Sequence, residues 1–347
     1  MQATQEAQPG PFYVFLDEIQ DVPGWEEVVR RLHSRDDTDV YITGSNARLL
    51  SGELATHLTG RYITIPVYPL SFDEYQRHHR AQGTTDSTDQ LFSKYMMFGG
   101  MPGLFVTGQP DQDRATEILT SIYESIVMKD VAGRYGIRDI ATLEKLSRYL
   151  FSTSGNLFSV NKVANTLTSA GANASYATVD NQISALERSF IVYSAQQERM
   201  RGKELLRPQR KFYPVDNGFR NLATGFNGSD RGAQLEGIVF MELQRRGYDV
   251  AIGSLPDGEI DFIAKRGNDK QYIQVTLNMT EEQTRERELA PLRRLGDAFP
   301  RTVLTLDWHS EGMTDEGIHI TNVMDWLCSE ERAGYDDTPK ECSQNGG

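Results

Sequence analysis

Two adjacent carboxylates, Asp17 and Glu18, come directly after the apolar run Phe12–Leu16. A run of this kind, without polar alternation, is typical of a strand buried on both faces of a parallel sheet. A carboxylate at the end of such a strand can hold Mg²⁺, and a glutamate beside it can polarise the attacking water in phosphoryl transfer. Because an apolar strand ending in Asp-Glu also occurs by chance, the pair indicates a phosphate centre only together with its neighbours.

The following segment supplies such neighbours. Residues 25–32 have helical periodicity, and residues 40–43 form a second apolar run. Strand, helix and strand at this spacing predict a right-handed parallel βαβ unit. Ser45 and Asn46, beyond the second strand, are candidate polar residues of such a centre, and Arg61 is a candidate charge-stabilising arginine.

The middle of the chain has a different pattern, in which helical periodicity is followed by two short apolar runs. The predicted helices cover residues 143–151, 160–169 and 179–191, and the predicted strands cover residues 192–195 and 211–215. Three helices followed by a hairpin are typical of a winged-helix module, a relative of the helix-turn-helix.

Basic residues gather between the two strands of this predicted hairpin, where the wing would lie. They are Arg199, Arg201, Lys203, Arg207, Arg210 and Lys211. Such a patch can follow the phosphate backbone of DNA. A solvated hairpin tip, or a surface that docks on the acidic N-terminal part, remains the alternative. Asp180 and Glu187 on the preceding helix disfavour DNA binding by that helix.

A third set of polar residues lies on a predicted helix and two predicted strands near the C-terminus. The helix, residues 235–246, carries Glu236, the first strand carries Asp261, and the second carries Gln274 and Thr276. This order resembles the restriction-endonuclease-like fold, whose motif is an aspartate, a gap, and then Glu-x-Lys. In that fold the carboxylates hold Mg²⁺ and the lysine activates the attacking water.

This sequence departs from the motif at two positions. Asp261 matches the aspartate, whereas Gln274 and Thr276 stand where the glutamate and the lysine belong. Gln274 can still ligate magnesium weakly together with Asp261, but threonine supplies no cation. Lys265 is expected beyond the strand end and Lys270 in a loop. The resemblance therefore implies a retained fold with lost or crippled cleavage, and an ordinary surface position for Asp261 is the structural alternative.

The remaining segments complete the predicted organisation. A short strand is predicted at residues 63–67 and a loop at residues 82–89. Ser71 and Glu74 predict a capping box at the start of a helix. Residues 116–128 have helical periodicity. The predicted domains are residues 1–78 (ATPase-like core), 79–139 (helical linker or lid), 140–220 (winged-helix-like), 221–328 (nuclease-like) and 329–347 (disordered tail).

An ordered set of motifs resembles a prokaryotic family of AAA+-type ATPases, related to the archaeal and STAND groups and fused to a C-terminal domain of unknown function. The motifs are Phe15-Leu16-Asp17-Glu18-Ile19-Gln20, Ile42-Thr43-Gly44-Ser45-Asn46-Ala47, Thr59-Gly60-Arg61, Tyr68-Pro69-Leu70-Ser71-Phe72-Asp73-Glu74-Tyr75, Phe98-Gly99-Gly100-Met101-Pro102, Lys211-Phe212-Tyr213 and Asp216-Asn217-Gly218.

The resemblance implies an α/β fold, with a truncated P-loop NTPase-type parallel sheet, an all-α or winged-helix middle module and a restriction-endonuclease-like α/β domain. It implies ATP and magnesium as cofactors, with Asp17 and Glu18 in the Walker B role. Such ATPases also carry a GxxxxGK[ST] loop, whose N–H groups and lysine bind the phosphates. No such pattern occurs in this sequence. We therefore expect a truncated gene product or a lost activity, with weak ATP binding and no hydrolysis.

Composition sets the remaining limits. The chain has 347 residues, a net charge of −13 and 38% apolar residues, which is typical of globular proteins rather than of a bulk cation. The two cysteines, Cys328 and Cys342, fit a reducing compartment, and no apolar stretch predicts a membrane span or a signal peptide. We expect a cytoplasmic protein.

The candidate partners are DNA, through the basic wing, and a second copy of the chain. The alternative function is a DNA-binding or metal-dependent nuclease-like protein.

Overall fold

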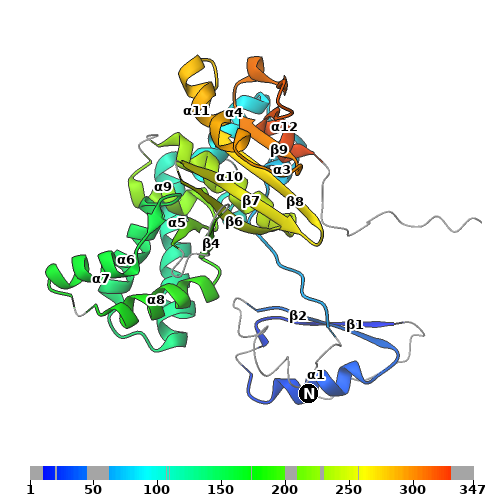
Figure 1. The fold of residues 1–347 in the computed structure, drawn as a ribbon. Coiled ribbons are helices and arrows are strands. Elements are labelled where there is room, and N and C mark those ends of the chain that lie inside the picture. The colour runs from blue at the N-terminus through cyan, green and yellow to red at the C-terminus, as the bar shows by residue number, and fades with distance from the viewer. Residues whose placement is uncertain are drawn as a thin grey trace, which may run out of the picture. The chain divides into compact units, whose positions relative to one another are not determined.

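The computed structural model describes residues 11–19, 22–44, 62–106, 108, 110–172, 174–199, 209–226, 230–256 and 258–329 (Figure 1). The chain forms two compact units. The first contains residues 1–67, 120–147 and 160–193, and the second contains residues 68–119, 148–159 and 194–347.

The N-terminal part of the first unit is a βαβ element. Strand β1 (Phe12–Leu16) pairs in parallel with β2 (Thr38–Ile42), and helix α1 (Trp25–His33) connects them. Trp25 and Val29 of α1 are buried against the apolar side chains of both strands. The predicted parallel unit is therefore confirmed, and both strands place their carboxyl ends at the same edge.

The other face of this small sheet differs from the prediction of burial on both sides. Phe15 is 70% exposed and stacks on Tyr41 with 4.9 Å between ring centroids, and Tyr13 is also exposed. Within the described part of the chain, α1 covers one face of the sheet and aromatic side chains line the other. An apolar run therefore marks the strand correctly but does not specify what covers it.

The predicted strand at residues 63–67 is wrong. These residues do not form a strand in the structure, and Ile63, Ile65 and Val67 are exposed. A single extended segment is stabilised as a strand only when a neighbour accepts and donates its backbone hydrogen bonds, and Pro66 has no N–H to donate. Apolar side chains alone do not supply this pairing.

The rest of the first unit is mainly helical, and its helices confirm the predicted periodicity. Ser175 caps α8 by accepting a hydrogen bond from Thr178 N. The elements in and around this region are α5 (Gln112–Ser125), a π-helix (Ile126–Gly133), α6 (Ile140–Ser152), α7 (Val160–Ser169) and α8 (Tyr176–Arg188).

The second unit begins with two helices that carry capping boxes. Ser71 and Glu74 form the predicted box at the start of α3, and Ser87 with Gln90 forms a second box at the start of α4. The predicted loop at residues 82–89 therefore ends at Ser87. The helices of this unit are α3 (Phe72–Ala81), α4 (Thr88–Phe98), α9 (Asn217–Thr224), α10 (Arg231–Arg245), α11 (Glu282–Arg293) and α12 (Val323–Cys328).

One mixed sheet organises the second unit (Figure 1). Among the described residues its strand order is β10-β11-β9-β8-β7-β6-β4-β5-β3. The strands are β3 (Leu157–Phe158), β4 (Val192–Arg199), β5 (Arg210–Pro214), β6 (Asp249–Leu255), β7 (Gly258–Arg266), β8 (Asp269–Thr276), β9 (Arg301–Thr305), β10 (Gly312–Met313) and β11 (His319–Asn322).

Helices α10 and α11 cover opposite faces of this sheet. Phe240 of α10 lies near Phe262 of β7, with 6.0 Å between ring centroids, whereas Leu292 of α11 packs in one cluster with Ile263. Phe262 and Ile263 are consecutive on a strand, so their side chains point to opposite faces. The sheet is thus the middle layer of three, and its polar side chains have little room except at strand ends and irregularities.

Two of the family-like motifs meet in this unit although they are far apart in the sequence. Asp216, the N-cap of α9, accepts hydrogen bonds from Gly218 N at 2.7 Å and from Gly100 N at 2.6 Å. Gly99 has a φ of +80°, and a Cβ there would lie 1.7 Å from the Asp216 carboxylate. Burial raises the pKa of Asp216 to about 6, against the lowering effect of these two N–H groups. Gly99 is therefore required by the close approach of Asp216.

Candidate functional site

The carboxylates predicted for phosphate chemistry lie at the shared carboxyl edge of β1 and β2. Asp17 follows β1, and Thr43 follows β2. The Thr43 hydroxyl donates a hydrogen bond to Asp17 Oδ1, and the same hydroxyl oxygen accepts a hydrogen bond from Glu18 N at 3.2 Å. Thr43 thus fixes both the Asp17 carboxylate and the turn that follows it.

The backbone at Glu18 has a left-handed conformation, with a φ of +48°. Such a conformation is uncommon for a residue other than glycine and is concentrated at functional sites. The chain therefore turns sharply after β1, immediately beside Asp17.

Sequence reasoning missed Thr43. The sequence signal for Thr43 is a hydroxyl at the end of the strand that pairs with the Asp17 strand, two residues before Ser45 and three before Asn46, the expected positions. Ser45, Asn46 and Arg61 lie outside the described residues, so their predicted roles remain predictions.

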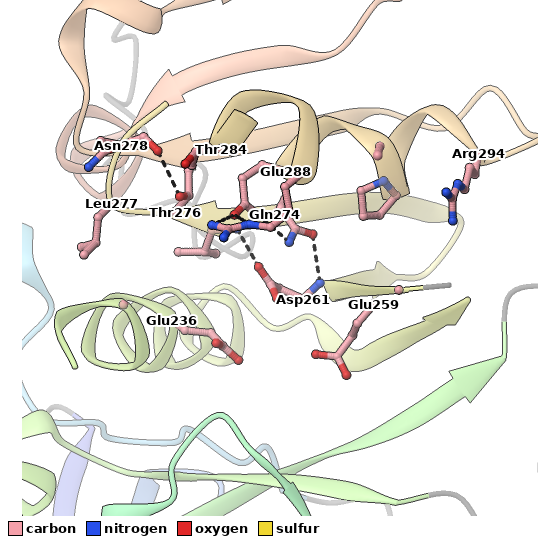
Figure 2. Close-up of a pocket in the computed structure, with 16 residues that line it drawn as sticks. Glu236, Glu259, Asp261, Gln274, Thr276, Leu277, Asn278, Thr284, Glu288 and Arg294 are labelled. Atoms are coloured by element: carbon pink, nitrogen blue, oxygen red, sulfur yellow. Dashed lines mark hydrogen bonds and ion pairs between the residues drawn. The ribbon is translucent and has the colours of Figure 1, made fainter. Parts of the chain in front are cut away.

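A second polar site lies in the sheet unit, in a pocket of about 670 Å³ between α10, β7, β8 and α11 (Figure 2). Glu236 comes from α10, and Glu259 and Asp261 come from β7. Figure 2 shows the carboxylates of Glu236 and Glu259 pointing toward one another, with Asp261 beside them. All four of the residues that the sequence grouped by resemblance, Glu236, Asp261, Gln274 and Thr276, therefore line one pocket.

A β-bulge positions Asp261. Ile260 pairs with Gly253 and Ile263 pairs with Ala251, so Asp261 and Phe262 together lie opposite Ile252. An extra residue in one strand re-aims a side chain and is common next to active sites. The bulge allows the Asp261 carboxylate to reach the backbone of β8, where Asp261 Oδ2 accepts a hydrogen bond from Val275 N at 2.8 Å.

Lys211 of β5 supplies the positive charge of this cluster. Its side chain is buried, its Nζ lies 3.2 Å from Glu236 Oε1, and it forms a second ion pair with Glu259. Tyr213, two residues along β5, donates a hydrogen bond from its hydroxyl to the same Glu236 oxygen at 2.7 Å. Sequence reasoning placed Lys211 in the basic wing and did not connect it with the carboxylates.

The pKa values in the cluster show strong mutual influence. Burial alone would lower the pKa of Lys211, but Glu236, Glu259 and Asp261 together raise it above its usual range. Burial, with the nearby Glu236 charge, raises the pKa of Asp261 well above that of an ordinary aspartate. The ammonium is therefore held in its charged form by the carboxylates around it.

Gln274 and Thr276, which stand at the two replaced motif positions, form hydrogen bonds within the protein. The Gln274 side-chain oxygen accepts a hydrogen bond from Asp261 N at 3.3 Å, and its amide donates to Glu288 Oε2 at 3.0 Å. Thr276 donates its hydroxyl to Asn278 O at 3.2 Å. In Figure 2 these side chains line the β8 side of the pocket.

Lys265 was predicted beyond the end of a strand and Lys270 in a loop, but both lie within strands. Lys265 is within β7 and forms an ion pair with Glu198 at 2.6 Å. Lys270 is within β8 and lies 3.6 Å from Asp297. The predicted positions of both lysines were therefore wrong, because each strand is longer than its apolar core.

The predicted basic wing divides into three groups. Arg201, Lys203 and Arg207 lie outside the described residues, Arg199 is exposed, and Arg210 is half-buried over the Phe212 ring. Lys211 is buried among carboxylates, and a side chain in that position does not face a phosphate backbone at the surface.

Among the residues that the structure describes, no group of three or more His, Cys, Asp or Glu side chains is arranged to hold a metal ion. None of the described helices has the length and apolar character needed to cross a membrane.

Comparison with known proteins relates the chain to two family models. Residues 1–76 match an AAA domain, and residues 89–230 match a domain of unknown function (DUF8612). A Walker-type ATPase of Pyrococcus abyssi aligns with a TM-score of 0.38 and 14% identity over 62% of this chain and 63% of that chain.

Two curated relatives are much closer in sequence. An uncharacterized protein of Haemophilus influenzae is 38% identical over 329 residues, which are 94% of this chain and 80% of that protein. An uncharacterized protein of Methanocaldococcus jannaschii is 30% identical over 80% of this chain, which spans 63% of that protein. The chain therefore belongs to the same family as the Haemophilus influenzae protein, and its residues 1–76 relate this family to the AAA-type P-loop ATPases.

Proposed function

We propose that residues 1–76 provide the metal-binding and water-activating half of an AAA-type nucleotide site. The contact between the Thr43 hydroxyl and the Asp17 carboxylate, at the adjoining carboxyl ends of two parallel strands, carries this proposal. In open parallel sheets, ligands bind beyond the carboxyl ends of the strands. The AAA domain match over the same residues supports the assignment.

The side chains present suit a magnesium nucleotide. Carboxylate and hydroxyl oxygens are hard ligands of the kind that Mg²⁺ prefers, and the Asp17 side chain is exposed at the edge of the sheet. A bound magnesium nucleotide would supply the phosphoanhydride bond that such a site hydrolyses.

Each residue then has a defined part. Asp17 would hold the cation, directly or through water. Thr43 restricts Asp17 to one orientation through its hydroxyl, which reduces the side-chain entropy lost on binding. Glu18, whose backbone N–H is tied to Thr43, would orient and polarise a water.

The phosphate-binding half has no counterpart in the printed sequence, which contains no GxxxxGK[ST] pattern. This chain is therefore expected to show no saturable ATP binding at micromolar concentrations in the presence of Mg²⁺, because the N–H cradle and lysine that grip the phosphates are missing. Isothermal titration calorimetry measures this directly.

Micromolar affinity for ATP would contradict this expectation. In that case the Asp17→Asn variant identifies the site. A loss of affinity in the variant would locate the nucleotide at the β1–β2 edge, whereas an unchanged affinity would place it elsewhere and remove the support for the proposed half-site.

A further inference from the structure

The restriction-endonuclease-like resemblance implies magnesium at Asp261 and Gln274, but the side chains present do not fit that ion. The Gln274 oxygen is engaged by Asp261 N, and the Gln274 amide is engaged by Glu288. One oxygen of Asp261 accepts a hydrogen bond from Val275 N. The Gln274 oxygen and one oxygen of Asp261 are therefore engaged by contacts within the sheet, and the Gln274 amide is engaged by α11.

The position between the carboxylates is also filled. The Lys211 side chain, only 6% exposed, reaches from β5 to both Glu236 and Glu259. Gly155 packs against Glu236 on another side. A Cβ added at Gly155 would lie 3.2 Å from Glu236 Oε2. Glu236 thus has Lys211 and Tyr213 on one oxygen and tightly packed backbone beside the other.

Charge balance explains why a cation is required at this position. Glu236, Glu259 and Asp261 bring three carboxyl groups into one partly buried pocket, and a buried charge is strongly unfavourable unless it is paired and hydrogen-bonded. An ammonium carries one positive charge and three donors. It can therefore satisfy several carboxylate oxygens without any metal.

We infer that the Lys211 ammonium is the resident cation of this cluster and takes the place of a divalent metal ion. A Mg²⁺ ion requires near-octahedral oxygen ligands at about 2.0–2.1 Å. It would have to displace Lys211 from two ion pairs and leave that ammonium buried without a partner. The pocket consequently excludes catalytic magnesium. Thr276 stands where the motif has its lysine, and Lys211 of β5 supplies the pocket with a cation instead. This inference concerns a different part of the chain from the nucleotide half-site, so each can fail alone.

Replacing Lys211 is expected to convert the cluster into a divalent-cation site. The Lys211→Met variant keeps an unbranched side chain that is one atom shorter and removes its charge, so its Tm is expected to fall by roughly 10 °C. Millimolar MnCl₂ is expected to restore much of this loss, because Mn²⁺ replaces the missing charge and stabilises the folded state by binding it. The wild-type Tm is expected to rise much less than that of the variant.

The site of binding is tested by anomalous diffraction. Crystals of Lys211→Met soaked in MnCl₂ are expected to show an anomalous peak between Glu236, Glu259 and Asp261, and wild-type crystals are expected to show none there. Lys265→Met, which removes a half-exposed lysine paired with Glu198, is the matched control and is expected to gain no manganese at the pocket.

A manganese peak among the carboxylates of the wild-type protein would overturn the inference. A folded Lys211→Met variant without a peak would overturn it as well. If Lys211→Met does not fold, the double variant Lys211→Met/Glu259→Gln removes one charge of each sign and retains Glu236 and Asp261 as ligands. The same peak is expected in the double variant, and its absence would again contradict the inference.

Discussion

Gly99→Ala is expected to destabilise the second unit by more than about 4 kcal/mol, among the largest effects that a single substitution produces. A Cβ at this position would lie 1.7 Å from Asp216 Oδ1, and the backbone φ of +80° is itself unfavourable for alanine. Asp216 cannot move away without losing its hydrogen bonds from Gly100 N and Gly218 N. Thermal unfolding followed by circular dichroism measures the loss.

Gly83→Ala is the matched control for this prediction. Gly83 also has a left-handed backbone, with a φ of +78°, but nothing lies within 4 Å of the position of its Cβ. Its substitution is expected to cost only about 1 kcal/mol, from backbone strain alone. Equal losses for the two variants would show that the clash with Asp216 does not exist.

Asp216→Asn is expected to destabilise the protein most strongly at acidic pH. The folded-state pKa of about 6 lies above the ordinary value of 3.8 because the carboxyl is buried. The folded chain therefore binds the proton more tightly than the unfolded chain, and this contribution is fully present below pH 3.8 and is lost as the pH rises through about 6. The size of this contribution is about 3 kcal/mol.

The asparagine cannot reproduce this pH dependence, because it does not titrate. It also directs an NH₂ group at one of the two N–H donors that Asp216 accepts, which leaves a buried donor unsatisfied at a cost of about 1–3 kcal/mol at every pH. Urea unfolding at pH 5 and pH 7.5 is expected to give a larger gap between wild type and variant at pH 5.

Asp139→Asn provides a control of opposite sign. Hydrogen bonds from the Thr142 hydroxyl and N–H lower the pKa of Asp139, so its contribution is present at neutral pH and is lost as the pH falls. A gap for Asp216→Asn that grows as the pH rises would contradict the assignment of Asp216 as a buried, easily protonated carboxyl.

Local signals in the sequence predicted the local structure well. Ser71 and Glu74 specify a helix start because both partners of the capping box lie within four residues. The run Phe12–Leu16, the helix after it and the run ending near Thr43 predict a parallel pair because such connections have one favoured hand. The partners of the capping box are neighbours in the chain, whereas the two strands are 26 residues apart and their pairing is predictable because one short helical connection joins them.

The candidate sites depend on contacts that no local window contains. Lys211 meets Glu236 across 25 residues, and Asp216 meets Gly100 across 116 residues. A basic residue beside other basic residues predicts a surface patch, and only the pairing of β5 within the sheet reverses that interpretation for Lys211. The same limit applies to Asp261, whose direction is set by a bulge against β6.

At the predicted nucleotide site, the sequence pattern identified the correct segment but not the residue that contacts Asp17. The polar residue beyond the second strand was expected at Ser45 or Asn46, whereas the contact with Asp17 is made by Thr43, immediately after β2. In a parallel pair the register determines which residue adjoins Asp17. Leu16 pairs with Ile42, so the residue after Ile42 is the one beside Asp17.

A Mn²⁺ titration observed by backbone amide NMR tests the proposed role of Asp17 most directly, because paramagnetic broadening detects even weak binding and locates it. Amide signals of Asp17, Glu18 and Thr43 are expected to broaden first, and Asp17→Asn is expected to abolish this effect. Asp37→Asn, which removes an exposed carboxylate paired with Arg35, is expected to leave it intact. Broadening elsewhere that leaves these three signals sharp, or that persists in Asp17→Asn, would contradict the account.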